Sequence, residues 1–205
     1  MRVIALFKCG LLFFLVMSFA SFTCGAIQGS AHDFSVLGWA NGEICLPCHT
    51  PHDADTTVTD APLWNHELTT VTFVLYSSPT LDSTVNQPRG PSRLCLSCHD
   101  GVTALDSYGS NSGGNYITGG ANLGSDLSDD HPISIYWSHQ TELLTSAACI
   151  RCHNPSPTDF NPILPLFDRY IECPTCHDPH NTSNYPRLLR KPLANSEICF
   201  HCHDK

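Results

Sequence analysis

A five-residue pattern, C-x-x-C-H, occurs five times in this chain of 205 residues and uses every cysteine after residue 26. The copies begin at unequal intervals, so they are not the units of a solenoid with one fixed period. Each copy places two thiols and one imidazole within a single turn of backbone. The chain is therefore expected to carry one kind of site five times over.

The spacing of the pattern suits covalent attachment of c-type haem. Two thiols separated by two residues can each add to one vinyl group of the porphyrin, and the histidine that follows then reaches the iron. The pattern predicts five haems c. The predicted attachment cysteines are Cys45, Cys48, Cys95, Cys98, Cys149, Cys152, Cys173, Cys176, Cys199 and Cys202, and the predicted proximal iron ligands are His49, His99, His153, His177 and His203.

Three other kinds of cysteine site fit the sequence less well than haem attachment does. Zinc ribbons pair two C-x-x-C units around one metal, which five units cannot satisfy, and they do not need a histidine after every pair. Disulfides could form in an exported chain. A redox-active C-x-x-C normally lies in a thioredoxin-like βαβ unit, and the sequence around these motifs predicts none. Haem attachment explains the five histidines, and the alternatives do not.

The first 26 residues have the pattern of a secretory signal peptide. A basic start is followed by an apolar run over 11–19 that is too short to span a bilayer with margin, and then by small residues. We expect cleavage after Ala26, with Ala20 as the second choice. Cys24 as a lipid anchor is the less favoured alternative, because the residues before it make a poor lipobox. The domain organisation expected is a signal peptide over 1–26 and a pentahaem cytochrome c domain over 27–205.

The part of the chain after the leader is acidic. All 19 Asp and Glu residues lie there, whereas two of the 10 Lys and Arg residues, Arg2 and Lys8, belong to the leader. The sequence has no basic patch that would predict binding to nucleic acid. Cationic proteins or metal oxides are the partners that this charge favours.

The sequence after the leader shows little sustained hydrophobic periodicity, and turn-forming residues are scattered through most of it. We expect mostly irregular structure with short α-helices and few or no strands, in which stacked haems take the place of a protein core. The segment 101–130 predicts an extended loop. Thr69 to Tyr76 is the best strand candidate, and Ser138 to Ala148 is a candidate helix.

The sixth coordination position of each iron must be filled by a histidine or stay open. Both methionines, Met1 and Met17, lie in the leader, so the His/Met pair of many cytochromes c is excluded. His52 and His180 follow a proximal histidine by three residues. Three residues span at most about 10 Å, which is too short to reach the opposite face of the same haem, so each is expected to bind a neighbouring haem.

Five further histidines remain. Four lie outside the haem motifs, and His201 lies inside the last one. His32, His66 and His131, which lie beside turn signals, are the next predicted distal ligands. His139 was interpreted as a surface or packed residue and His201 as a residue of the last haem loop, although either could ligate a haem of another chain. Trp39, Trp64 and Trp137 are expected to pack on porphyrin faces.

The segments CLPCHTPH, PLWNH, LCLSCHDG, DLSDDHPISI and CPTCHDPH, in this order between His32 and His203, resemble multihaem cytochromes with paired C-x-x-C-H motifs. The resemblance implies bis-histidine haems, loops with short helices, and haems packed in alternating parallel and T-shaped pairs. It supports a distal role for His32, His52, His66, His131 and His180. Proteins of this family are similar to periplasmic and outer-surface electron carriers of metal-respiring bacteria, and some relatives form extracellular filaments.

The function expected is electron transfer through five closely packed bis-histidine haems in periplasmic or extracellular respiration. Redox proteins or extracellular acceptors are the expected partners, and an end-to-end homopolymer is expected by analogy alone. No integral membrane span is expected after the leader. The alternative is a multihaem reductase of a small oxyanion, which requires one iron with an open face.

Overall fold

The computed structural model describes residues 27–81, 83–137 and 164–203. The leader, the third motif from Cys149 to His153, His139 and the helix expected at Ser138 to Ala148 lie outside these ranges. Within them, no helix is both long and apolar enough to cross a bilayer.

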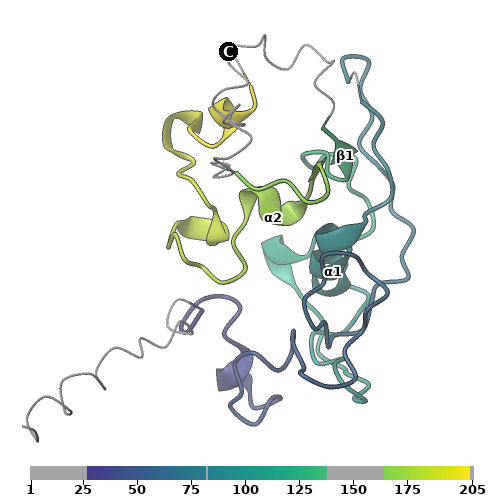
Figure 1. Ribbon diagram of the computed structural model, residues 1–205, viewed down its shortest axis with the longest axis vertical. Helices are drawn as coiled ribbons and strands as arrows, with labels where there is room; N and C mark the ends of the chain where they lie inside the picture. Colours follow the sequence, from purple (N-terminus) through teal and green to yellow (C-terminus); the bar gives the residue numbers. More distant parts are fainter. Residues whose placement is uncertain (1–26, 82, 138–163, 204–205) are drawn as a thin grey trace, which may run out of the picture.

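Regular secondary structure is sparse in the described ranges, and short helices and turns join long irregular segments (Figure 1). This confirms the fold class expected from the sequence, including the loop over 101–130, where one short helical turn interrupts irregular backbone. The α-helices are α1 (Gly90–His99) and α2 (Cys173–Cys176), the 3-10 helices are η2 (Phe34–Leu37), η3 (Gly119–Ala121), η5 (Pro186–Leu188), η6 (Ala194–Ser196) and η7 (Cys199–His201), and the strands are β1 (Ile135–Tyr136) and β2 (Tyr170–Ile171).

Both α-helices contain a haem motif. The ten residues of α1 end with Cys95, Cys98 and His99, while α2 is the single turn from Cys173 to Cys176. Residues three apart lie on one face of a helix, so helical backbone turns the two thiols of a motif to the same side. The two helices lie next to each other at the centre of the molecule (Figure 1).

The strand expected at Thr69 to Tyr76 does not form. The segment is extended, and among the described residues it pairs with other backbone only through one isolated bridge, between Val74 and Asp126. Beside that bridge, the side-chain amide of Gln87 accepts from the Phe73 N–H at 2.9 Å and donates to its carbonyl at 2.8 Å. A side chain therefore takes the hydrogen bonds that a partner strand would make, and the ladder stops.

The apolar core is divided into small clusters beside α1. One cluster contains Val58, Trp64 and Leu94, and the other contains Phe73, Leu96 and Leu127. Leu94 and Leu96 lie on different faces of α1, so the helix contributes to both clusters. Neither cluster is large enough to be the core of a domain.

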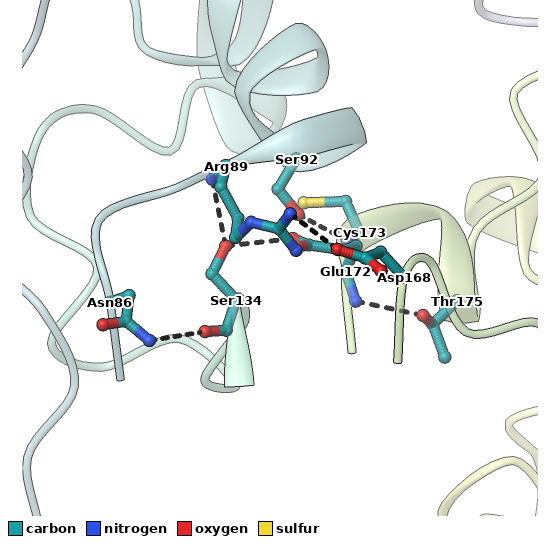
Figure 2. Close-up of polar contacts among 8 residues, drawn as sticks. All are labelled: Asn86, Arg89, Ser92, Ser134, Asp168, Glu172, Cys173 and Thr175. Carbon is teal, nitrogen blue, oxygen red and sulfur yellow. Dashed lines mark hydrogen bonds and ion pairs between the residues drawn. The ribbon is translucent and has the colours of Figure 1, made fainter. Parts of the chain in front are cut away.

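A buried polar network joins α1 to the segment before α2 (Figure 2). The Ser134 hydroxyl donates to Glu172 at 2.9 Å and accepts from the Arg89 N–H at 3.1 Å. The Arg89 guanidinium lies 3.9 Å from the Glu172 carboxylate and 3.2 Å from the Asp168 carboxylate. Burial raises the pKa of Glu172, although the hydrogen bonds and Arg89 act in the opposite direction.

Glu172 also begins α2. Its side chain accepts from the Thr175 backbone N–H, while the Thr175 hydroxyl accepts from the Glu172 N–H at 3.0 Å, which makes a capping box. In addition, the Ser92 hydroxyl of α1 accepts from the Cys173 N–H at 2.8 Å (Figure 2). The backbone of the fourth haem motif is thus held by side chains from two parts of the chain.

Replacing Glu172 with alanine should destabilise the haem-loaded protein by about 3 kcal/mol, because the change removes the α2 cap, the acceptor of the Ser134 hydroxyl and the buried ionic partner of Arg89. The control is Asp168→Ala, which removes the other acidic partner of Arg89. The Asp168 side chain is 68% exposed, whereas that of Glu172 is fully buried, so the control should cost less than about 1 kcal/mol. Guanidinium denaturation followed by haem circular dichroism measures both, and equal losses would contradict this account of the network.

Candidate haem sites

Three of the four described proximal histidines are held in one orientation by backbone carbonyls. In three motifs the ring Nδ1 lies within hydrogen-bond distance of a carbonyl oxygen, and because that oxygen can only accept, Nδ1 carries the proton. The Nε2 atom is then left unprotonated, as iron ligation requires. The Nδ1···O distances are 2.7 Å from His49 to Pro62, 2.7 Å from His99 to Ala121 and 2.9 Å from His177 to Arg187.

Three proximal histidines each face a histidine from outside the haem motifs. In every case the two ring centroids are 6.2 Å apart, and the partner comes from a distant part of the sequence. The pairs are His49 with His180, at an interplanar angle of 33°, His99 with His32, at 62°, and His203 with His131, at 76°.

The separation of the paired rings fits an intervening iron. Metal–nitrogen bonds of about 2.0 Å on both sides, plus about 1 Å from each nitrogen to its ring centre, put the two centroids roughly 6 Å apart. Aromatic rings also pack at similar distances, and Trp64 and His66 do so at 6.1 Å. What distinguishes the three histidine pairs is that each combines one motif histidine with one predicted distal histidine.

The first and fourth motifs are each supported by a four-residue segment with the same hydrogen-bond pattern. The sequence alone does not reveal these segments. We call the segments from Pro62 to Asn65 and from Arg187 to Arg190 the straps. The first residue of each strap accepts from the proximal histidine. The N–H of the last residue donates to the carbonyl of the second motif cysteine, at 3.0 Å from Asn65 to Cys48 and at 2.8 Å from Arg190 to Cys176.

The side chain of the last strap residue makes a matching contact in both sites. The Asn65 amide donates to the Leu46 carbonyl at 2.7 Å, and the Arg190 Nε donates to the Pro174 carbonyl at 2.7 Å. Leu46 and Pro174 each directly follow the first cysteine of their motif. PLWN and RLLR therefore serve the same role with different side chains, which is why the repeat is hard to see in the sequence.

The second motif is followed by a tight turn. The buried Asp100 carboxylate accepts from the Val102 and Thr103 N–H groups at 2.8 and 2.9 Å. Gly101, between them, has φ +72°, and a Cβ there would overlap the Asn122 side chain. The HDG sequence thus lets the chain turn back toward Ala121, whose carbonyl orients His99.

The fourth motif opens into an apolar pocket of about 820 Å³, part of which is open to solvent. Cys173, Cys176 and His177 line it together with leucine side chains at positions 75, 96, 123 and 127. Binding pockets for cofactors are typically of this apolar character. His131, which faces His203, also lines this pocket, so the fourth and fifth sites adjoin.

The first, second and fourth sites meet at the short segment from His177 to His180. His177 belongs to the fourth site, and His180 faces His49 of the first. The Pro179 carbonyl accepts from Nδ1 of His32, which faces His99 of the second, at 3.2 Å. Burial lowers the pKa of His32, and the nearby His99, His180 and His177 rings act in the same direction, whereas the Pro179 hydrogen bond acts in the other.

The motif cysteines in the described ranges are thiols without disulfide bonds. Burial raises the pKa of Cys48 to about 11 and also raises the pKa values of Cys98 and Cys176. The Cys95 and Cys173 thiols lie side by side, and their hydrogen bond raises the pKa of Cys95 and lowers that of Cys173. Reactive redox cysteines generally have lowered pKa values, so the environment of the four thiols with raised pKa values does not favour thiol redox chemistry.

Two predicted distal ligands are placed elsewhere. The His52 side chain is exposed, and that of His66 is buried, with Nε2 3.3 Å from the Leu105 carbonyl and 3.5 Å from the Cys98 sulfur. Across 27–81, 83–137 and 164–203, neither ring lies opposite a proximal histidine at the 6.2 Å separation of the three pairs. In the same ranges, no histidine lies opposite His177 at that separation. A distal role for His52 and His66 stays a prediction.

Comparison with protein-family models gives a match to the end of the chain. No match was found among curated proteins. Residues 165–205 match the family model described as the doubled CXXCH motif, and this range contains the fourth and fifth haem motifs. The match supports a c-type cytochrome-like family and indicates that the chain carries covalently bound c-type haem.

Proposed function

We propose that this chain is an electron carrier with five covalently bound haems c and no substrate site. The observation that carries the proposal is the set of three histidine pairs with equal 6.2 Å separations. In it, His180, His32 and His131 are the distal ligands of the haems in the first, second and fifth motifs. Haem supplies the redox chemistry when bound, and the chain's residues hold each iron with two neutral imidazoles.

The proximity of the sites supports electron transfer between them. The segment from His177 to His180 serves three sites, Cys95 lies beside Cys173, and His131 borders both the fourth and the fifth site. Haems bound at these sites would lie close enough to one another for direct electron transfer. The protein groups orient the ligands and exclude water, while the electrons pass between cofactors.

We place this carrier in the periplasm, at the outer surface or outside the cell. Haem attachment and the signal-peptide pattern of the first 26 residues support export. The acidic composition favours cationic redox proteins or metal oxides as partners. A homopolymer with end-to-end haem contacts is the proposed further assembly, and electron microscopy of the secreted fraction tests it.

The first test is the mass and absorption spectrum of the chain expressed in a host that attaches c-type haem. We expect the mass of the processed chain plus five haems and low-spin spectra in both oxidation states. Carbon monoxide should leave the spectrum of the reduced protein unchanged, because every iron has two histidine ligands.

Two results would count against the proposal. A mass with fewer than five haems would contradict the assignment of the cysteines. A high-spin fraction that binds carbon monoxide or nitrite would show an iron with an open face and would favour the reductase alternative.

A further inference from the structure

The segment from His177 to His180 is held in its conformation by one side chain. Asp178 is 4% exposed, and its carboxylate accepts from the His180 N–H at 3.0 Å, from the Thr182 N–H at 2.8 Å and from the Thr182 hydroxyl. Its own N–H donates to the Leu188 carbonyl of the strap at 2.6 Å. A carboxylate that binds the N–H two residues later closes a local turn and fixes the backbone between them.

The turn closed by Asp178 presents groups to two different haem sites. The His180 ring, on one side, faces His49 at 6.2 Å. The Pro179 carbonyl, on the other, accepts from Nδ1 of His32 at 3.2 Å, and the His32 ring faces His99. A hydrogen bond to the second nitrogen of a ligating imidazole fixes the orientation of its ring.

We infer that Asp178 is a positioning residue for two haems at once, because the turn it closes sets the orientation of His180 at the first site and of His32 at the second. The inference rests on the proposed haem ligation. Asp178 itself touches neither iron, so its effect passes through the backbone of Pro179 and His180. A single side chain then adjusts two neighbouring members of the electron-transfer chain together.

The second motif supplies a matched control for Asp178. Asp100 also follows a proximal histidine, is 1% exposed, and accepts from the N–H two residues later and from a threonine just beyond. The residue two positions after it is Val102, whose side chain is 59% exposed, where the fourth motif has His180. The two aspartates therefore close the same turn, but only the turn at Asp178 carries a distal histidine.

The experiment compares electron paramagnetic resonance spectra of the fully oxidised, haem-loaded variants, since the g values of a low-spin haem depend on the orientation of its axial ligands. The variants His180→Met and His32→Met first identify the signals of the first and second haems. Asp178→Ala should then shift both signals away from their wild-type g values. Asp178→Asn, which keeps an acceptor for the His180 N–H, should restore most of the wild-type spectrum.

Asp100→Ala should lower stability to a similar extent and leave the signal of the first haem at its wild-type g values. If Asp178→Ala is not recovered with five haems, Asp178→Glu, which moves the carboxylate by one methylene, must shift the same two signals. Wild-type signals for either haem in the recovered variant, or an altered first-haem signal in Asp100→Ala, would overturn the inference. Should neither methionine variant move a signal, the haem ligation itself would have failed instead.

Discussion

A chain made without haem should fail to hold this fold. Replacing all ten motif cysteines with alanine is expected to abolish the cooperative thermal transition and to make the chain sensitive to proteases throughout. The reason is that α1 has ten residues, α2 has four, and the two strands have two each, which is below the length at which isolated elements are stable in water. The apolar clusters of the described part of the chain are too small to compensate.

Side chains beside the motifs show what the porphyrins are expected to cover. Leu63 in the first strap is 54% exposed, and Phe200 inside the last motif is 40% exposed. Haem would bury such groups and supply the missing core, as bound metal does in small metal-dependent domains. Far-UV circular dichroism with limited proteolysis tests this, and the haem-loaded wild type is the control. A cooperative unfolding transition in the chain without haem would contradict the prediction.

Replacing His180 with methionine should raise the midpoint potential of one haem by roughly 0.1–0.3 V and leave the other four nearly unchanged. A thioether ligand favours ferrous iron more than imidazole does, and axial ligands set haem potentials over a range of about 0.8 V. A spectroelectrochemical titration of the variant and the wild type measures the change as the displacement of one component among five.

Leu193→Met is the control for this substitution, because it adds a methionine at an exposed residue, 55% accessible to solvent, that lies outside the haem motifs. It should leave the titration curve unchanged. If no component rises in His180→Met, then His180 is not the distal ligand of the first haem, and the 6.2 Å ring pair with His49 is ordinary packing. His180→Ala adds a second readout, since an open iron at this site should bind carbon monoxide.

The sequence predicted the chemistry of the sites better than the path of the chain between them. Every C-x-x-C-H copy is a local signal, because five adjacent residues carry the attachment chemistry. The pairing of His180 with His49 and of His32 with His99 depends on how distant segments meet, and no spacing rule contains that information. Chain reach alone predicts that His180 cannot serve the iron of its own motif, and the structure places its ring opposite His49.

The features that the sequence did not predict are those in which different side chains make equivalent hydrogen bonds. Asn65 and Arg190 occupy equivalent positions in the two straps but share neither charge nor shape. In the sequence Asp178 is one residue of the CPTCHDPH segment with no evident role, whereas its burial and hydrogen bonds show that it organises the turn. The strand that was expected at Thr69 to Tyr76 is missing for a related reason. The β-propensity of these residues favours extended backbone, but the Gln87 side chain makes the hydrogen bonds that a neighbouring strand would make.

The pairing of His49 with His180 also dictates an order of assembly. A chain is made from its amino end, so about 130 residues must be added after the first proximal histidine before its partner exists, which takes roughly ten seconds or more at the usual rates of synthesis. The fifth motif has the reverse order, because His131 is already present when His203 is made. Of the three pairs, the first is therefore the one in which the proximal histidine is made before its partner.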